Sequence, residues 1–373
     1  MKIGILSLSY GYNYGGLLQG YALQTVLERM GYQVEYFHTD ADNILDWKKL
    51  ILHWAYRFIK KWVLKQDTVP VFAELKIKKL NPIIGKELVR FANIYIHTKE
   101  VKKLENLNGK DYGAIVVGSD QVWRPMFFNF RGGIANAYLA FAKAWNIKRI
   151  AFAASFGVDY WEYSNKQTQV CKKLAQYFNA ISVREESGKT MCQKYLGVKA
   201  KLVLDPTLLL SQKEYEKIID LGCTHKCEGD LLCYILDETS EKQQIVKSLS
   251  QQKGYKPFTV LAKNRNITAP IDDQMMPSME QWLRGFKEAS FIVTDSFHAC
   301  VFSIIFRKNF VVIGNKKRGI ARIESLLKMF ELEERLVERY EEVDALVPIQ
   351  YEKVYRRLEL LKKDSLDFLQ NNL

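Results

Sequence analysis

Residues 291–310, FIVTDSFHACVFSIIFRKNF, join a short strand, a polar turn and an apolar helix in one stretch. Phe291–Val293 predicts a buried strand, and the helix is expected to begin near His298. Asp295 and Ser296 in the turn are good N-cap residues, so the first N–H groups of this helix should face the turn. Such a helix end favours a bound phosphate or carboxylate. We therefore predict an anion site at this turn.

His298 lies at the start of that predicted helix and is one of only five histidines in the chain. The ordinary charge change of histidine falls near neutral pH, which suits proton transfer next to a bound anion. The alternative is a partly buried histidine that caps its own helix. The spacing alone does not separate these two interpretations.

Strands and helices alternate along the rest of the chain. The opening strand Lys2–Ser9 is followed by the glycine-rich turn Tyr10–Gly16 and a helix over Leu17–Met30. Ala135–Ala144 and Ser278–Lys287 are further predicted helices. This alternation predicts an α/β protein of two Rossmann-like, doubly wound domains with the best binding crevice between them.

The predicted domains are 1–200, 201–345 and a final helix over 346–373 that packs back on the N-terminal domain. Pro206 breaks regular structure where the strand and helix pattern restarts. A basic, aromatic, helical insertion is expected at about 46–107.

Residues 46–65 within that insertion read DWKKLILHWAYRFIKKWVLK. Several tryptophans and aliphatic residues fall on one helical face, and lysines and arginine occupy the rest. A basic amphipathic helix with tryptophans fits the surface of an anionic membrane. The alternative is a surface helix that packs its aromatic stripe on the domain core.

Composition limits the function classes. The net charge of +13 favours anionic partners, but the basic residues are dispersed and no nucleic-acid-binding motif is present. We therefore expect no nucleic acid partner. Six dispersed cysteines, no leader-like N-terminus and no long apolar run predict a cytoplasmic protein. Cys223, His225 and Cys227 do not have a zinc spacing, so no metal site is expected.

Polar residues follow several predicted strands. Ser119, Asp120 and Gln121 follow a buried strand over Ala114–Gly118, at an edge where open α/β sheets bind ligands. Arg184 follows another strand and is suited to hold a carboxylate or phosphate through two hydrogen bonds. The alternative for Arg184 is an ion pair with a neighbouring glutamate.

Five strings in order resemble the polysaccharide pyruvyl transferase family over residues 1 to about 330. They are Asn13-Tyr-Gly-Gly-Leu-Leu-Gln19, Val117-Gly-Ser-Asp-Gln-Val-Trp123, Ser182-Val-Arg-Glu185, Asp205-Pro-Thr-Leu-Leu209 and Thr294-Asp-Ser-Phe-His-Ala299. The resemblance implies two Rossmann-like domains arranged as in GT-B glycosyltransferases. It also implies transfer from phosphoenolpyruvate to a hexose of a lipid-linked (undecaprenyl-type) repeat unit, as in capsule or exopolysaccharide synthesis. The product would be a cyclic pyruvate ketal, and phosphate would be released.

That resemblance assigns roles to the residues above, with phosphoenolpyruvate as co-substrate and no cofactor. We expect catalytic roles for His298 and Arg184. The expected donor-binding residues are Ser296, Lys316, Lys317 and Arg318. The residues expected near the acceptor are Asn13, Gly15, Gly16, Gln19, Ser119, Asp120 and Gln121. Because lipid-linked acceptors are handled at the cytoplasmic membrane face, contact with the inner membrane surface is also expected.

Two other functions fit the same sequence. A nucleotide-sugar glycosyltransferase of GT-B shape would share the two-domain architecture. A non-catalytic polysaccharide-binding or membrane-surface protein would share the charge and the basic helix. Binding of phosphoenolpyruvate, and not of UDP- or GDP-sugars, distinguishes a pyruvyl transferase from the glycosyltransferase. Release of phosphate distinguishes it from the non-catalytic binding protein.

Overall fold

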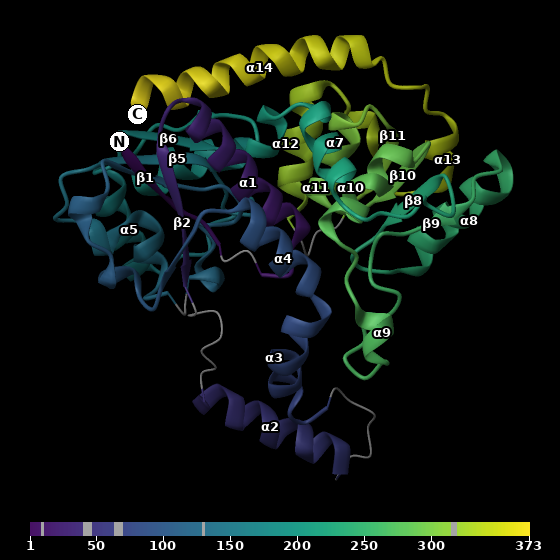
Figure 1. The fold of residues 1–373 in the computed structure, drawn as a ribbon, viewed down its shortest axis with the longest axis horizontal. Coiled ribbons are helices and arrows are strands. Elements are labelled where there is room, and N and C mark those ends of the chain that lie inside the picture. The colour runs from purple at the N-terminus through teal and green to yellow at the C-terminus, as the bar shows by residue number, and fades with distance from the viewer. Residues whose placement is uncertain (9–10, 40–46, 63–69, 129–130, 315–318) are drawn as a thin grey trace.

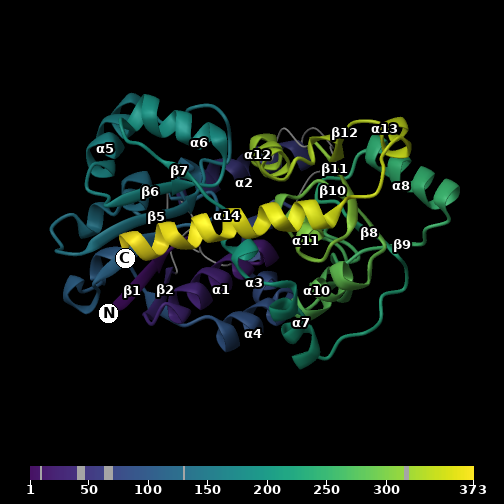
Figure 2. The ribbon, with the colours of Figure 1, turned by 90° about the horizontal axis from the view of Figure 1, so that it is seen from above.

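Two parallel β-sheets form two domains that lie side by side, and one long C-terminal helix runs over both (Figures 1 and 2). The computed structural model describes residues 1–8, 11–39, 47–62, 70–128, 131–314 and 319–373. The prediction of an α/β protein with two Rossmann-like, doubly wound domains is confirmed.

The first sheet is entirely parallel. Its strands, in spatial order, are β3 (Thr98–Val101), β2 (Gln33–Thr39), β1 (Lys2–Leu6), β4 (Ala114–Val117), β5 (Lys148–Ala154), β6 (Ala180–Val183) and β7 (Lys201–Leu202). From β3 to β6 this is the strand order of the dinucleotide-binding fold. The order reverses between β1 and β4, which pair with Ile3 opposite Ala114. Ligands of such sheets bind beyond the carboxyl ends of the strands at that point.

Helices cover both faces of the first sheet (Figure 2). They are α1 (Tyr14–Arg29) and α4 (Lys86–Tyr95) on one face, with α5 (Asn165–Ala175) and α6 (Glu186–Met191) on the other. Helix α1 buries Leu17, Leu18 and Leu27, and shortly after its last residue Gly31 has a φ of +87°, which suits glycine. The predicted helix at 135–144 is wrong: two 3₁₀ turns form there, because buried Leu139 between them adopts a left-handed backbone (φ 59°).

The second sheet is also parallel. Its strands, in spatial order, are β12 (Leu336–Val337), β11 (Asn309–Ile313), β10 (Phe291–Thr294), β8 (Leu231–Tyr234) and β9 (Pro257–Phe258). Its helices are α7 (Gln212–Leu221), α8 (Ser240–Lys253), α9 (Ile271–Gln274), α10 (Met279–Glu288), α11 (Phe297–Ile305), α12 (Ile320–Phe330) and α13 (Tyr340–Asp344). Here the order reverses between β8 and β10, as in flavodoxin-like sheets.

The two domains meet just after residue 202. Strand β7 pairs with β6, so the first sheet extends slightly past the predicted boundary at residue 200. Helix α14 (Tyr351–Asn372) then returns over the first domain, where its Phe368 ring lies 6.2 Å from the Phe152 ring of β5, measured between centroids. At its other end the Tyr355 hydroxyl donates to the Ile305 carbonyl at 2.6 Å. Helix α14 therefore ties both domains together.

The predicted insertion at 46–107 is only partly an insertion. Helix α4 packs on α1 through Leu88 and Phe91, and β3 is the edge strand of the first sheet. Within residues 46–107, only α2 (Trp47–Trp62) and α3 (Ala73–Ile84) project from the body, and α3 lies beside α9 of the second domain (Figure 1). Helix α4 and strand β3 therefore belong to the first domain, because the apolar residues of α4 are buried in its core and β3 pairs with its sheet. No helix among the described residues combines the length and apolar character of a membrane-spanning segment.

Aromatic packing joins the domains beside the cleft. Tyr14, at the start of α1, stacks on Trp282 of α10 with ring centroids 5.3 Å apart. The Tyr14 hydroxyl also donates to the Pro277 carbonyl at 2.7 Å. These contacts belong to one hydrophobic core that continues from the first domain into the second. The relative position of the two switch points is therefore fixed by packing.

Candidate active site

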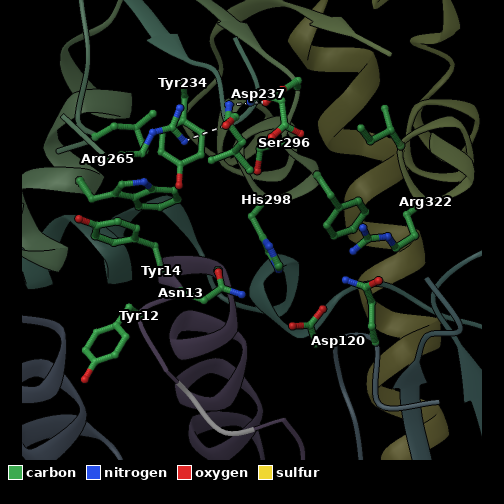
Figure 3. A pocket seen from close by; sticks show the side chains of 18 of the residues that line it. Tyr12, Asn13, Tyr14, Asp120, Tyr234, Asp237, Arg265, Ser296, His298 and Arg322 are labelled. Atoms are coloured by element: carbon green, nitrogen blue, oxygen red, sulfur yellow. Dashed lines mark hydrogen bonds between the residues drawn. The ribbon is translucent and has the colours of Figure 1, made fainter. Parts of the chain in front are cut away.

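The two switch points face each other across a cavity of about 720 Å³ (Figure 3). The first domain contributes the segments that follow β1 and β4, and the second contributes those that follow β8 and β10. The volume lies within the usual range of about 300–1,000 Å³ for small-molecule sites. Both domains therefore present the carboxyl ends of their central strands to one cavity.

His298 projects into the middle of this cavity from the first turn of α11 (Figure 3). Only 9% of the residue is exposed. Its ring lies against the backbone of Gly15 in the other domain, so closely that an added Cβ at Gly15 would be 2.1 Å from Nδ1. Glycine at position 15 therefore makes room for the imidazole.

The charge state of His298 is set by its burial. Burial lowers the pKa of His298 from 6.5 to about 4, and the charge of nearby Arg184 adds to this, while Asp205 opposes it. Nε2 lies 3.9 Å from Oδ2 of Asp205, beyond hydrogen-bond distance, and has no hydrogen-bond partner among the described residues. This imidazole is therefore neutral at pH 7, which differs from the predicted change of charge near neutrality.

Arg184 lies behind His298 rather than in the cavity wall. Its Nη1 donates to Asp205 at 2.8 Å and its Nη2 to Asp120 at 3.4 Å, and its side chain is 1% exposed. The planar fork thus holds two carboxylates, not the neighbouring glutamates of the alternative interpretation. Direct contact between Arg184 and a donor stays a prediction. The geometry makes Arg184 a positioning residue for Asp120 and Asp205.

Asp205 anchors this network at the domain junction. Its Oδ1 accepts hydrogen bonds from the Thr207 amide at 3.1 Å and the Thr207 hydroxyl at 2.6 Å. Burial raises its carboxyl pKa, but the charge of Arg184 and the hydrogen bonds from Thr207 and Arg184 outweigh this, and the pKa is lowered overall. Asp205 therefore stays ionised beside the imidazole.

Asp120 presents a carboxylate to the cavity opposite His298 (Figure 3). It follows β4 with a left-handed backbone, φ 60°, which is uncommon outside glycine and concentrates at functional sites. Its side chain is 9% exposed and faces Arg184. The backbone turn is therefore shaped to place this carboxylate at the cavity edge.

Arg322, from the first turn of α12, also lines the cavity (Figure 3). It is 8% exposed, and burial together with the Arg184 charge lowers its guanidinium pKa to about 10. The Phe297 ring lies 4.4 Å from the Arg184 guanidinium and 5.8 Å from that of Arg322. An anion in the cavity would relieve the repulsion between these two cations.

The other end of the cavity is aromatic. Tyr12, Tyr14 and Tyr234 lie on the far side of His298 from Asp120 and Arg322 (Figure 3). The Trp282 ring, which packs against Tyr14 and Tyr234, is part of the same wall. The cavity thus has a charged end at Asp120 and Arg322 and an aromatic end, at which Arg265 and Asp237 also lie, with the imidazole between them (Figure 3).

The turn before α11 is held differently from the prediction. Ser296 occupies the N-cap position but its side chain makes no capping hydrogen bond. Asp295 instead accepts from the Leu236 and Asp237 amides at 2.7 and 3.0 Å and pairs with Lys242 at 2.6 Å. These bonds fix the two switch-point loops of the second sheet to each other. The Ser296 side chain is left to line the cavity.

The structure brings most of the predicted site residues to one place. Those that line the cavity are His298, Ser296, Asn13, Gly15, Asp120 and Gln121. Gln19 and Ser119 lie behind it, because the Gln19 amide donates to Ser119 Oγ and to Asp205. Gly16 is not part of the lining. Lys316, Lys317 and Arg318 lie outside the described residues.

Sequence reasoning missed Asp205, Arg322 and the aromatic wall. Asp205 belongs to one of the five strings that carry the resemblance, but nothing in its local pattern predicts a role in the site. Arg322 is close in sequence to the predicted donor-binding residues Lys316, Lys317 and Arg318, and only the folded helix α12 places it in the cavity wall. Among the described residues no cluster of histidine, cysteine, aspartate or glutamate is arranged to hold a metal ion.

Comparisons with known proteins give one family and several distant structures. The model of the polysaccharide pyruvyl transferase family matches residues 13–317. A search of curated proteins gave no match.

Solved structures similar to the chain include UDP-GlcNAc 2-epimerase from Neisseria meningitidis bound to UDP-GlcNAc (12% identity, 100% of each chain, TM-score 0.46). Arabidopsis thaliana UGT89C1 complexed with quercetin is another (10% identity, 99% of this chain and 98% of that one, TM-score 0.48). A third is UDP-GlcNAc 2-epimerase from Methanocaldococcus jannaschii (11% identity, 97% and 93%, TM-score 0.44). At these scores the likeness carries no conclusion about activity.

Proposed function

Because this chain belongs to the polysaccharide pyruvyl transferase family, we propose that it transfers a pyruvyl group from phosphoenolpyruvate to a hexose of a lipid-linked polysaccharide repeat unit. The product is a cyclic pyruvate ketal, and phosphate is released. One observation carries the proposal: His298 stands in an interdomain cavity between a charged end and an aromatic end. Such an arrangement suits a small dianion on one side of a proton-transfer group and a sugar on the other.

The donor fits the charged end. Phosphoenolpyruvate carries a phosphate and a carboxylate on one three-carbon frame, so it needs several cationic or N–H donors. Arg322 lines this end, and α11 begins at the cavity with Ser296, so its first N–H groups, which no helical carbonyl satisfies, are available to an anion there. Arg184 supports the site indirectly through Asp120 and Asp205.

The proposed reaction moves one proton to the donor and joins two sugar oxygens to it. C3 of phosphoenolpyruvate takes a proton, which leaves C2 electrophilic, and a first hydroxyl adds to C2 and loses its proton. The C2–O bond to phosphate then breaks, and a second hydroxyl adds and loses its proton to close the ketal. Of the two hydroxyl protons, one replaces that given to C3 and the other leaves with phosphate. His298 is the proposed group that gives and takes these protons, a contribution of about 100- to 10,000-fold.

Donor binding would change the protonation of His298. Burial and the nearby Arg184 charge keep the imidazole neutral at pH 7. A bound dianion within a few ångströms favours the imidazolium and raises its pKa. His298 would therefore become a proton donor only when the donor is present.

The acceptor fits the aromatic end. The C–H faces of a hexose ring stack on aromatic side chains, and Tyr12, Tyr14 and Tyr234 line this end. Asn13 supplies an amide group that can bind sugar hydroxyls. A sugar held there would direct its hydroxyls toward His298 and the charged end. A lipid-linked acceptor further implies work at the inner face of the cytoplasmic membrane.

A thermal-shift comparison tests the proposal against its two alternatives. Phosphoenolpyruvate at about 100 times its Kd should stabilise the protein by about 2.7 kcal/mol, a rise in Tm of several degrees. UDP- and GDP-sugars should produce no comparable shift, and stabilisation by them alone would favour a glycosyltransferase. Release of phosphate with a lipid-linked acceptor, abolished in His298→Gln, separates the enzyme from a non-catalytic binding protein. Without phosphate release from any acceptor, the enzymatic proposal is wrong.

A further inference from the structure

We infer that α2 is a docking element for an anionic membrane surface. The inference rests on the proposed function in one respect, since a lipid-linked acceptor gives such docking its purpose. Helix α2 stands away from both domains at the tip of an arm formed with α3 (Figure 1). The arm is therefore free of the sheet packing that positions the cavity.

The outer face of α2 is apolar and exposed. At about 100° per residue, its apolar positions cover about 160° of the helix circumference. The large apolar residues on this face are between 50% and 69% exposed. They are Ile51, Leu52, Tyr56, Phe58, Ile59 and Trp62. Exposed apolar patches of this kind on a monomer mark interaction sites.

The inner face of α2 is already occupied. Leu50 is 5% exposed, and the Trp54 ring contacts Phe72 at 4.9 Å between centroids. Arg57 donates to Glu74 of α3 at 2.8 Å, and the Trp54 indole donates to the same carboxylate at 3.2 Å. The predicted aromatic stripe is thus divided: its inner residues anchor the helix on α3, and the others face away from the body.

Lysines flank the exposed apolar face. The Lys60 ammonium lies 4.9 Å from the Tyr56 ring centroid, and that of Lys61 lies 5.9 Å from the Trp62 ring centroid. Lys76, Lys78 and Lys79 add three exposed lysines on α3. Lysines beside tryptophan and tyrosine suit a helix that lies in the interface of an anionic bilayer.

The charge on the arm favours a membrane over a second copy of this chain. Two copies that met through α2 would bring Lys60 and Lys61 of each toward like charges, in a protein whose net charge is +13. Anionic headgroups would neutralise the same lysines while the apolar side chains enter the acyl boundary. The described part of α2 carries no acidic residue that would oppose such headgroups.

The base of the arm lies at the acceptor end of the cavity. At the end of α3, the Ile84 carbonyl accepts from the amide of Met276, which lines the cavity. The next residue, Gly85, contacts Tyr12 so closely that an added Cβ would lie 1.9 Å from its ring. Docking through α2 would therefore hold the aromatic end of the cavity near the membrane, where the lipid of the acceptor is anchored.

Vesicle sedimentation with the full-length protein tests this inference. Vesicles with about 30% phosphatidylglycerol in phosphatidylcholine should bind the protein at least about tenfold more strongly than pure phosphatidylcholine, and added salt should weaken binding. The double variant Leu52→Glu/Ile59→Glu places two acids on the exposed face and should lower binding by about tenfold or more. The matched control Leu360→Glu alters an equally exposed leucine on α14 and should bind like the wild type.

Three outcomes would overturn the inference. One is wild-type protein that does not sediment with anionic vesicles, and another is equal binding by the double variant and Leu360→Glu. The third is a wild-type dimer that the double variant converts to a monomer, because α2 would then be an interface between copies. Stabilisation by phosphoenolpyruvate should be the same in all three proteins. If the protein does not bind membranes but is stabilised by phosphoenolpyruvate, the membrane inference is wrong and the proposed donor stands. If it binds membranes but is not stabilised by phosphoenolpyruvate, only the proposed donor is wrong.

Discussion

Replacing Gly15 with alanine should displace the central imidazole without touching a charged group. Gly15 and Gly16 are adjacent in the first turn of α1, and neither has a positive φ. Alanine is favoured over glycine in helices by about 0.5–1 kcal/mol, so neither replacement should weaken α1 itself. The two variants differ in what the added methyl group meets.

The expected loss follows from the contact distances. A Cβ at residue 15 would lie 2.1 Å from Nδ1 of His298, whereas non-bonded heavy atoms prefer about 3.5 Å or more, so the ring must move by about 1.4 Å. A displacement of about 1 Å can cost about 100-fold in rate, or about 2.7 kcal/mol. At Gly16 the nearest atom is the Asn13 amide nitrogen, 3.3 Å away at the end of a side chain that can move.

Phosphate release from phosphoenolpyruvate with a saturating acceptor measures the effect. Gly15→Ala should lose about 100-fold or more in kcat, and Gly16→Ala should stay near the wild type. If Gly15 acts through His298, adding Gly15→Ala to His298→Ala should cost little more, because contacting residues are not additive. Equal activity of the two glycine variants, or losses that multiply in the double variant, would refute the reasoning.

Three further predictions follow from the charged end. Arg322→Gln should raise the KM for phosphoenolpyruvate by about 10- to 100-fold, as expected for loss of a charge-assisted hydrogen bond. The control Arg339→Gln changes an exposed arginine and should leave this KM unchanged. An unchanged KM in Arg322→Gln would show that Arg322 does not bind the donor. Arg184→Lys should lower the free energy of unfolding by about 2 kcal/mol in urea titrations, since one ammonium cannot serve both carboxylates, and wild-type stability would contradict this. The pKa of His298 is about 4 in the folded protein and 6.5 in the unfolded chain, so between these pH values only the unfolded chain binds the proton. The free energy of unfolding is therefore unaffected by this residue above pH 6.5 and falls by about 3 kcal/mol as the pH is lowered to 4. In His298→Gln, the free energy of unfolding should fall by about 3 kcal/mol less than in the wild type between pH 7 and pH 4. Identical decreases in the two proteins would contradict the low pKa of His298.

The two-domain α/β architecture could be predicted from the sequence because the central strands are continuous apolar runs. Phe291–Thr294 forms β10 and Phe297–Ile305 forms α11, within a residue or so of the prediction. Short elements escaped detection: β12 has two residues, and the segment around Leu139 folds into 3₁₀ turns through one left-handed residue. Local patterns do not encode such interruptions, because they depend on packing around the segment.

The candidate site was only partly predictable for a related reason. His298 and Asp120 were found because they follow strands whose carboxyl ends must face a ligand. Asp205 and Arg322 become part of the site through contacts between distant segments, and no periodicity reports those. The low pKa of His298 likewise comes from burial against the other domain, which a sequence does not show.

Mass spectrometry of a lipid-linked glycan incubated with the protein and phosphoenolpyruvate tests the central proposal most directly. We predict that the glycan gains one pyruvyl unit as a ketal, that one phosphate is released for each, and that His298→Gln yields neither product. A glycan pool that stays unmodified while the folded protein is saturated with phosphoenolpyruvate would contradict the proposal, as would full product formation by His298→Gln.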